Sequence, residues 1–158
     1  MSKVVIIMGS KADLEWANQI SKVLKSFEIE TISRIASAHK VPLKCFNLIK
    51  EYEKENVVFI TIAGMSNALS GFTDAQTHCP VIACPPYSDK FGGADLYSSI
   101  RMPSGVAPLT ILSPENAALA AAKIMGLSNP DIQKRIMAFQ EKKRNELEEA
   151  DNNLINDN

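Results

Sequence analysis

The apolar residues of this chain alternate between short continuous runs and the spacing of an amphipathic helix, and this alternation limits the possible folds more than any other feature. Residues 4–8 form a continuous apolar run that ends at Gly9. The next segment places its apolar side chains at helical spacing, at Leu14, Ala17, Val23, Leu24 and Phe27. Repeated units of strand and helix build a parallel sheet with helices on its faces. The pattern therefore predicts an α/β fold.

Five strand-like runs are present, separated by Gly and Pro residues. They cover residues 4–8, 29–35, 57–63, 81–84 and 107–112. Helices are predicted after Gly9, from Pro42, over 67–77, over 95–102, over 114–125 and from Asp131 onward. We see no internal repeat and no linker, so the 158 residues indicate a single domain. The last helix becomes charged, and we expect residues from about 152 to 158 to form a disordered tail.

Two further segments bear on assembly and on ligand access. The alanine-rich run 117–122 is apolar on nearly all sides, which predicts close packing against another helix and makes oligomerisation a reasonable expectation. Pro85-Pro86 and Gly92-Gly93 bound a loop of about ten residues. Such a loop is long enough to cover a site.

Composition excludes several classes of protein. Seventeen basic and eighteen acidic residues give a net charge of -1, so we expect neither nucleic acid nor an anionic membrane as a partner. The five apolar residues before Gly9 are too few for a signal peptide or a membrane span, which predicts a cytoplasmic protein. Three cysteines without a C-x-x-C pair fit reduced thiols and argue against a disulfide framework or a zinc site.

The first candidate site is Gly9-Ser10-Lys11, at the end of the first strand. It does not match a Walker loop or a dinucleotide fingerprint, because the glycines that those motifs require are absent. Ser10 and Asp13 resemble a capping box. Free amides at a helix start, with Ser10 and Lys11 beside them, also suit an anion. A plain βα turn and a phosphate site both remain open, and in the second case Asp13 would take sugar hydroxyls.

The second candidate site is Ser37-Ala38-His39-Lys40, at the predicted end of the second strand. His39 is one of only two histidines, and the loops beyond the carboxyl ends of parallel strands are where α/β proteins bind ligands. A structural histidine at a strand end is the alternative. His78, in contrast, has no motif around it, and we interpret it as structural or exposed. After the third strand, the small residues from Gly64 to Gly71 allow a ligand to approach the backbone.

Five motifs, in order, resemble the phosphoribosylaminoimidazole carboxylase family, also called PurE, over nearly the whole chain. They are Met8-Gly9-Ser10-Lys11-Ala12-Asp13, Ser37-Ala38-His39-Lys40, Ala63-Gly64-Met65-Ser66-Asn67-Ala68-Leu69-Ser70-Gly71, Cys84-Pro85-Pro86 and Ser98-Ser99-Ile100-Arg101-Met102-Pro103-Ser104-Gly105. Lys40 and Ser66-Asn67 resemble the class II branch, because class I members typically carry Arg in place of Lys40 and a second histidine in a glycine-rich loop after the third strand. Met65 is a departure, since class II chains usually carry Arg there.

The resemblance implies a flavodoxin-like three-layer sandwich with a five-stranded parallel sheet and a C-terminal helical extension. It implies a homo-octamer with each site at a subunit junction. The implied reaction is the reversible carboxylation of 5-aminoimidazole ribonucleotide (AIR) with carbon dioxide to 4-carboxy-5-aminoimidazole ribonucleotide (CAIR), in purine biosynthesis. By the family pattern His39 is catalytic, and the substrate-binding residues are Ser10, Asp13, Ser37, Ala38, Lys40, Gly64 and Ser66.

No cofactor is expected, because the aminoimidazole ring carbon is electron-rich enough to attack carbon dioxide itself. His39 would then relay the proton that leaves the ring. The sequence holds neither the lysine between two methionines that marks biotin attachment nor a cluster with metal-ligand spacing. Two alternatives remain open: the class I mutase reaction on N-carboxyaminoimidazole ribonucleotide, and a non-enzymatic flavodoxin-like module that binds a phosphorylated metabolite or flavin.

Overall fold

A single parallel sheet of five strands organises the chain, and the computed structural model describes residues 3–156 of it. The strands lie in the order β2-β1-β3-β4-β5, which is the order of the flavodoxin-like fold that the family resemblance implies. All four neighbouring pairs are parallel, with Val4 opposite both Thr31 and Val58. The strand bounds are β1 Lys3–Met8, β2 Glu30–Ile35, β3 Val58–Ile62, β4 Val81–Ala83 and β5 Leu109–Thr110.

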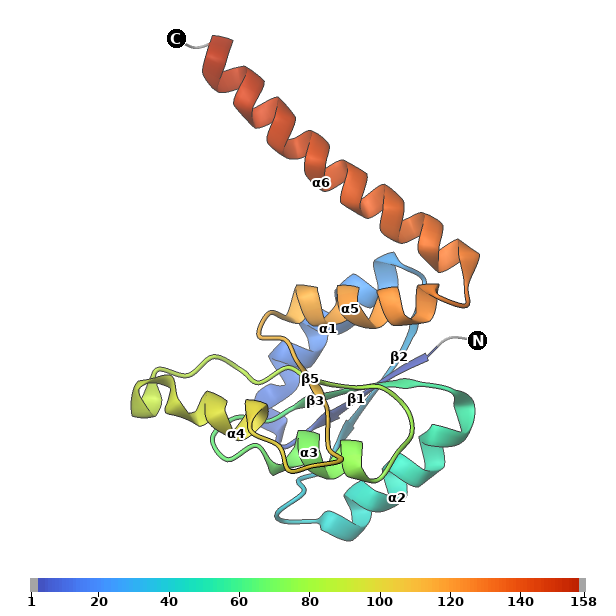
Figure 1. The fold of residues 1–158 in the computed structure, drawn as a ribbon, viewed down its shortest axis with the longest axis vertical. Helices are drawn as coiled ribbons and strands as arrows, with labels where there is room; N and C mark the ends of the chain where they lie inside the picture. Colours follow the sequence, from blue (N-terminus) through green and yellow to red (C-terminus); the bar gives the residue numbers. More distant parts are fainter. Residues whose placement is uncertain (1–2, 157–158) are drawn as a thin grey trace.

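Helices cover both faces of the sheet, so that the molecule has three layers (Figure 1). The bounds are η1 Lys11–Asp13, α1 Leu14–Ser26, α2 Pro42–Tyr52, η2 Glu53–Glu55, α3 Ala68–Ala75, η3 Lys90–Leu96, α4 Tyr97–Ile100, α5 Pro114–Gly126 and α6 Pro130–Asn156, where η marks a 3₁₀ helix. Helices α1 and α5 pack on one face with the start of α6, and α2 and α3 pack on the other.

The continuous apolar runs of β1 and β3 follow from this layering. Successive residues of a strand point to opposite faces, so Val4 and Ile6 pack toward α1 and α5 while Val5 and Ile7 pack toward α2. All four are fully buried. A strand that is covered on both faces gains nothing from polar residues, which is why β1 reads as an uninterrupted hydrophobic run.

Three predicted elements are shorter than expected. The strand predicted over 107–112 is reduced to β5, because Pro108 has no N–H to donate to the sheet. The strand predicted over 81–84 ends at Ala83 as β4, ahead of Pro85-Pro86. The helix predicted over 95–102 is reduced to α4, and most of the preceding segment is η3, where Phe91, Gly92 and Gly93 have positive φ angles.

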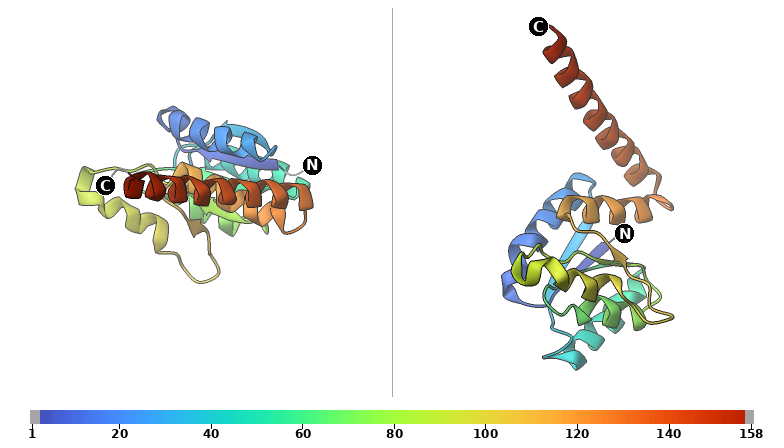
Figure 2. Two further views of the ribbon diagram at one scale, coloured as in Figure 1. Left: turned by 90° about the horizontal axis from the view of Figure 1, so that it is seen from above. Right: turned by 60° about the vertical axis from the view of Figure 1, so that its left-hand side comes forward.

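The two C-terminal helices also differ from expectation. The alanines of α5 do pack closely against another helix, but their partners are α1 and α6 of the same chain. Helix α6 continues to Asn156, so the predicted disordered tail is wrong for residues 152–156, and 157–158 lie outside the described residues. Figures 1 and 2 show the C-terminal part of α6 projecting away from the sheet. None of the helices within residues 3–156 combines the length and the apolar character that crossing a bilayer requires.

Candidate functional site

The loops that follow β1, β2 and β3 begin side by side at the carboxyl edge of the sheet. The backbone N–H of Gly9 donates to the carbonyl oxygen of Ile62 at 2.8 Å, and that of Ala36 donates to Met8 at 2.9 Å. The chain moves from β1 outward to β2 and then returns to the other side of β1 with β3. The point where strand order reverses is where open α/β sheets bind ligands. Two of the three predicted site loops, after β1 and β3, flank this point, and the third lies next to the β1 loop.

The loop after β1 contains the predicted capping box, which the structure confirms. The Ser10 hydroxyl accepts a hydrogen bond from the N–H of Ala12 at 3.2 Å. The Asp13 carboxylate accepts from the Ser10 N–H at 2.9 Å and lies 3.1 Å from the Ser10 hydroxyl. Both side chains are partly exposed. At Gly9 a Cβ atom would lie 3.3 Å from the Cβ of Ala63, a tight contact, so glycine favours the close approach of the two loops.

The turn after β2 presents His39 and Lys40 to solvent. The Ser37 carbonyl oxygen accepts from the N–H of Val41 at 2.9 Å, and the Ser37 hydroxyl accepts from the N–H of Lys40 at 3.2 Å. These two bonds close the turn just before α2 begins at Pro42. Within residues 3–156, the side chains of His39 and Lys40 make no hydrogen bond or ion pair. Both groups are therefore available to a ligand.

The loop after β3 carries Gly64, Met65 and Ser66. Met65 has a φ angle of 60°, a left-handed conformation that is uncommon for this residue type, and its side chain is 67% exposed. Ser66 is also exposed. Asn67 is buried and caps α3, because its side-chain oxygen accepts from the N–H of Ser70 at 3.2 Å. The loop is thus anchored at Asn67 and exposed just before it.

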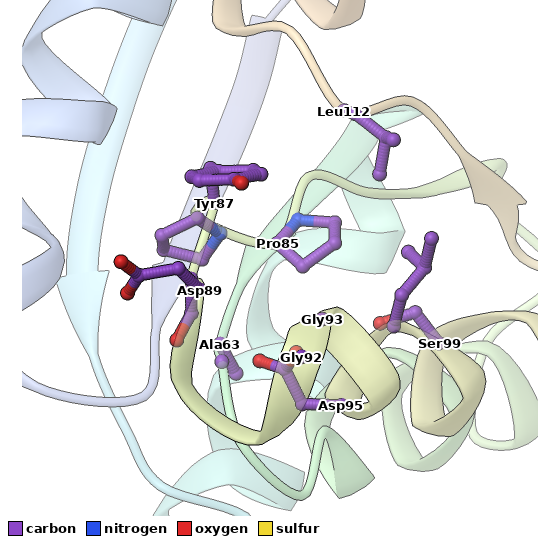
Figure 3. A pocket seen from close by; sticks show the side chains of 13 residues that line it. Ala63, Pro85, Tyr87, Asp89, Gly92, Gly93, Asp95, Ser99 and Leu112 are labelled. Atoms are coloured by element: carbon purple, nitrogen blue, oxygen red, sulfur yellow. The ribbon is translucent and has the colours of Figure 1, made fainter.

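A cavity of about 430 Å³ opens beside this loop, toward β4 and β5. Its walls come from the loop after β3, from the long loop and η3 that follow β4, from α4 and from the segment after β5. Figure 3 shows Pro85 and Tyr87 on one side of the cavity and Ser99 and Leu112 on the other. The acidic side chains of Asp89 and Asp95 also line it. The loop bounded by Pro85-Pro86 and Gly92-Gly93 thus lines a cavity.

The predicted site residues divide into two groups. Gly64 lines the cavity. The other predicted residues lie along the same edge of the sheet but outside the lining of the cavity. They are Ser10, Asp13, Ser37, Ala38, His39, Lys40 and Ser66. Sequence reasoning missed Tyr87, Asp95 and Leu112 as cavity residues, because only the folded chain brings the loops after β4 and β5 against the loop after β3.

Cys84 and Cys45 are poor candidates for a nucleophile. Cys84 is buried next to the sheet core, and burial raises the pKa of its thiol to about 11. Burial likewise raises the pKa of Cys45 to about 11. Both thiols are protonated at neutral pH, and a thiol is a much weaker nucleophile than a thiolate. Cys84 is thus a small buried residue of the core.

Comparison with known proteins connects this site to a family. Residues 3–146 match the AIR carboxylase family model. A phosphoribosylaminoimidazole carboxylase of Archaeoglobus fulgidus is 60% identical over 152 residues, which cover 96% of this chain and 84% of that protein. A bifunctional phosphoribosylaminoimidazole carboxylase/phosphoribosylaminoimidazole succinocarboxamide synthetase of Mus musculus is 43% identical over 129 residues, 80% of this chain but 30% of that protein.

A solved structure agrees with the sequence comparison. The crystal structure of Treponema denticola PurE superposes with a TM-score of 0.95 at 46% identity, covering 98% of this chain and 99% of that chain. The two chains therefore share the same backbone fold over almost their full length. The family match, these relatives and the common fold together place the chain in the AIR carboxylase family.

Proposed function

We propose that this enzyme carboxylates AIR with carbon dioxide to give CAIR, reversibly, as a step of purine biosynthesis, and that it does so without ATP, biotin or a metal ion. The observation that carries the proposal is the meeting of three loops at the carboxyl edge of the sheet, joined by the Gly9–Ile62 and Ala36–Met8 backbone bonds. This arrangement offers an anion-binding turn, an unpartnered histidine and a glycine-lined approach in one place.

The reaction needs few catalytic groups. The electron-rich ring carbon of AIR forms a bond to the carbon of carbon dioxide, and an electron pair of one C=O bond moves to oxygen to give the carboxylate. The ring carbon then carries both a proton and the carboxylate. Loss of that proton returns its bonding pair to the ring and restores aromaticity. The enzyme therefore has to orient two reactants and move one proton.

His39 is the group that we assign to this proton transfer. Imidazole has an ordinary pKa close to neutrality, so a histidine can accept the proton in the forward direction and return it in the reverse direction. The His39 side chain is exposed at the carboxyl edge and makes no hydrogen bond or ion pair within the described part of the chain. No competing partner has to be displaced before substrate binds.

The remaining predicted residues divide by the part of AIR that they would hold. Ser10, Asp13, Ser37 and Lys40 are assigned to the ribose phosphate, and Ala38, Gly64 and Ser66 to the imidazole and the carboxylate. Support comes from the Lys40 ammonium, which has no partner among residues 3–156, and from the small side chains of Ala63 and Ser66 near Gly64. The Ser10 hydroxyl lies against Asp13, so a phosphate that accepts its proton has to replace this contact.

We assign the enzyme to class II, which acts on AIR and carbon dioxide directly. Lys40 and Ser66-Asn67 favour this class over the class I mutase, which rearranges N-carboxyaminoimidazole ribonucleotide. Met65 stands where class II chains usually have Arg, and its exposed side chain leaves the edge without that positive charge. Nothing in the structure explains this replacement.

We further propose a cytoplasmic homo-octamer in which each site is completed at a subunit junction. The support is a set of large apolar side chains that are exposed around the cavity and the sheet edge at β5. They are Tyr87, Phe91, Tyr97, Ile100, Leu109 and Leu112. Exposed apolar surface of this kind usually marks a protein interface.

The decisive test is the initial rate of the purified enzyme with AIR and dissolved carbon dioxide, in the presence of EDTA and without ATP. We expect saturable production of CAIR. The same preparation is assayed with freshly made N-carboxyaminoimidazole ribonucleotide. Turnover of that compound alone would contradict the class II assignment and favour the mutase, and a requirement for metal or ATP would contradict the proposed chemistry.

A further inference from the structure

Ser98, in α4, belongs to a motif that supports the family resemblance but that has no role in the site so far described. Its hydroxyl contacts two elements that are distant in sequence. The hydroxyl oxygen accepts a hydrogen bond from the backbone N–H of Asn67 at 2.9 Å and lies 3.1 Å from the carbonyl oxygen of Met65. It also lies 2.7 Å from the carbonyl oxygen of Asp95, in its own segment. One side chain therefore joins the loop after β3 to the opposite wall of the cavity.

The single proton of the Ser98 hydroxyl determines which of these contacts coexist. The hydroxyl donates either to Met65 or to Asp95, because it has one proton to give. It accepts from the N–H of Asn67 in both cases. The bond from Asn67 is therefore the constant link, whichever of the two carbonyl oxygens takes the hydroxyl proton.

Asn67 extends this link through its side chain, which is almost completely buried. Its amide nitrogen donates to the Ser99 hydroxyl at 2.9 Å, while its amide oxygen caps α3 at Ser70. The Ser99 carbonyl oxygen in turn accepts from the Thr110 hydroxyl of β5 at 3.0 Å. The loop after β3, α4 and β5 are thus connected by hydrogen bonds between buried or partly buried groups.

The segment held by these bonds is the one that carries Gly64 and Ser66. Between them, Met65 has a left-handed backbone conformation that costs energy for a residue with a side chain. Such a conformation persists only where the surroundings hold it in place. The Ser98 hydroxyl contacts the loop at Met65 and at Asn67, on both sides of Ser66.

We propose that Ser98 is a positioning residue for substrate binding, holding the 64–67 loop in the conformation in which Gly64 and Ser66 contact the substrate. This inference rests on the proposed function for its kinetic consequence. Ser98 does not touch the reacting atoms, and its effect passes through the loop. Because His39 lies on the turn after β2, loss of the Ser98 hydroxyl leaves the proton-transfer group in place.

The kinetic test compares three variants with the unmodified enzyme. Ser98→Ala removes the hydroxyl and raises KM for AIR roughly fivefold, the effect of losing one ordinary hydrogen bond, with kcat within about twofold. Ser98→Thr keeps the hydroxyl and returns KM toward the original value. Ser26→Ala is the matched control, because it removes a hydroxyl that bonds a helix carbonyl in α1, far from the site, and it leaves both constants unchanged.

Hydrogen exchange, measured without substrate, tests the same inference independently of the reaction. The Asn67 amide donates to the Ser98 hydroxyl, so a peptide covering 64–69 exchanges faster in Ser98→Ala than in the unmodified protein, and Ser26→Ala does not change it. Unchanged exchange, or an unchanged KM for AIR in Ser98→Ala, would overturn the inference. Absence of any AIR turnover in the unmodified enzyme would instead overturn the proposed function, and the exchange rates would still decide whether Ser98 holds the loop.

Discussion

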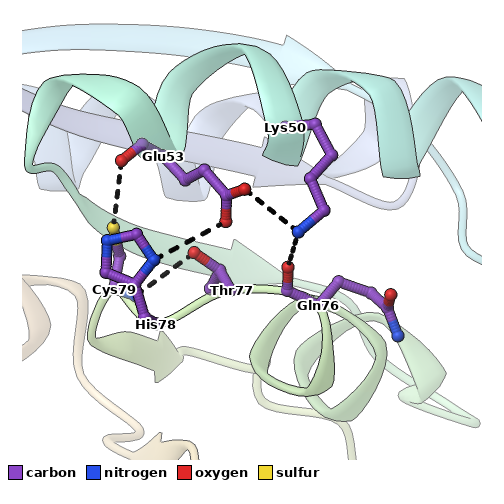
Figure 4. A network of polar contacts seen from close by, with 6 residues as sticks. All are labelled: Lys50, Glu53, Gln76, Thr77, His78 and Cys79. Atoms are coloured by element: carbon purple, nitrogen blue, oxygen red, sulfur yellow. Dashed lines mark hydrogen bonds and ion pairs between the residues drawn. The ribbon is translucent and has the colours of Figure 1, made fainter.

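The two histidines of the chain lie at opposite edges of the sheet, are both exposed, and differ in their polar neighbours. At the carboxyl edge, the side chain of His39 makes no hydrogen bond or ion pair within residues 3–156. At the other edge, the His78 ring nitrogen Nδ1 lies 4.0 Å from the Glu53 carboxylate, in the network drawn in Figure 4. Glu53 also pairs with Lys50 at 3.0 Å, and Lys50 donates to the carbonyl oxygen of Gln76.

This contrast separates groups that hold the fold from groups that are free to act. The Lys50–Glu53 pair ties the end of α2 to the segment between α3 and β4, and the Lys50 ammonium holds the pKa of the Glu53 carboxyl below its ordinary value. The side chains of Lys40 and His39, in contrast, make no hydrogen bond or ion pair to any residue from 3 to 156. Polar groups that satisfy one another contribute to stability, whereas unpartnered groups at a strand end are available to a ligand.

The largest expected effect is the loss of turnover on replacing His39. His39→Asn lowers kcat by a factor of about 10² to 10⁴, the usual contribution of a proton-transfer group, with little change in melting temperature. His78→Asn is the matched control and keeps kcat within about twofold. Steady-state kinetics with AIR and carbon dioxide measure both. Near-normal turnover in His39→Asn would remove the functional difference between the two histidines.

The two lysines provide the next comparison. Lys40→Ala raises KM for AIR roughly 10- to 100-fold, because a charge-assisted bond to the phosphate is lost, and leaves stability almost unchanged. Lys50→Ala has the reverse pattern: it leaves KM unchanged and lowers the free energy of unfolding by about 0.5 kcal/mol, as expected for a half-exposed pair. Kinetics and urea unfolding of the same two preparations measure these effects. A raised KM for AIR in Lys50→Ala would contradict the proposal that substrate binds at the carboxyl edge and that Lys50 only stabilises the opposite edge.

The pH dependence of stability sharpens the account of the Glu53 network. The pKa of the Glu53 carboxyl is lowered in the folded state from an ordinary value of 4.5. The ionised carboxylate therefore contributes to the stability of the fold at pH values above 4.5. This contribution is lost as the pH falls through the folded-state pKa. Glu53→Gln is therefore less stable than the unmodified chain by about 0.5 kcal/mol above pH 5, and the difference shrinks below pH 4.5. Urea unfolding between pH 3 and 7 measures the difference in stability between the two proteins. A difference that grows toward low pH would contradict a lowered Glu53 pKa in the folded state.

The smallest expected effect concerns two left-handed residues, one near each edge. Met65 and Asn56 have φ angles of 60° and 53°. Asparagine tolerates this conformation better than methionine does. Met65→Gly therefore stabilises the fold by about 0.5 kcal/mol, while Asn56→Gly changes it by less than about 0.3 kcal/mol. Thermal unfolding measures both, and equal effects would show that Met65 is not strained.

The sequence predicts most of this fold because the sheet is covered on both faces. The runs of β1 and β3 are continuous and apolar, and Gly9 and Gly64 end them where the chain must turn. The edge strand β5 is less predictable. It has one neighbour only, and the apolar stretch around it is shortened by Pro108 and remains largely exposed.

The candidate site is predictable only in part. The turn containing His39 could be placed at the end of β2 because parallel strands bring their carboxyl ends to one edge. The cavity could not be predicted from the sequence. Its lining residues Tyr87, Ser99 and Leu112 come from three segments that meet only in the folded chain. The link from Asn67 to Ser98 is equally invisible in the sequence, because a motif does not show where a hydroxyl points.

The projecting end of α6 has a consequence for spectroscopy. Residues 141–156 are exposed throughout and are held mainly by the helix's own backbone and by pairs such as Lys143–Glu146, at 3.0 Å. A helical segment of this length with little tertiary packing is only marginally stable in water. If the proposed octamer forms and its subunits support this segment, dilution that dissociates the subunits removes part of the circular dichroism signal at a helix wavelength.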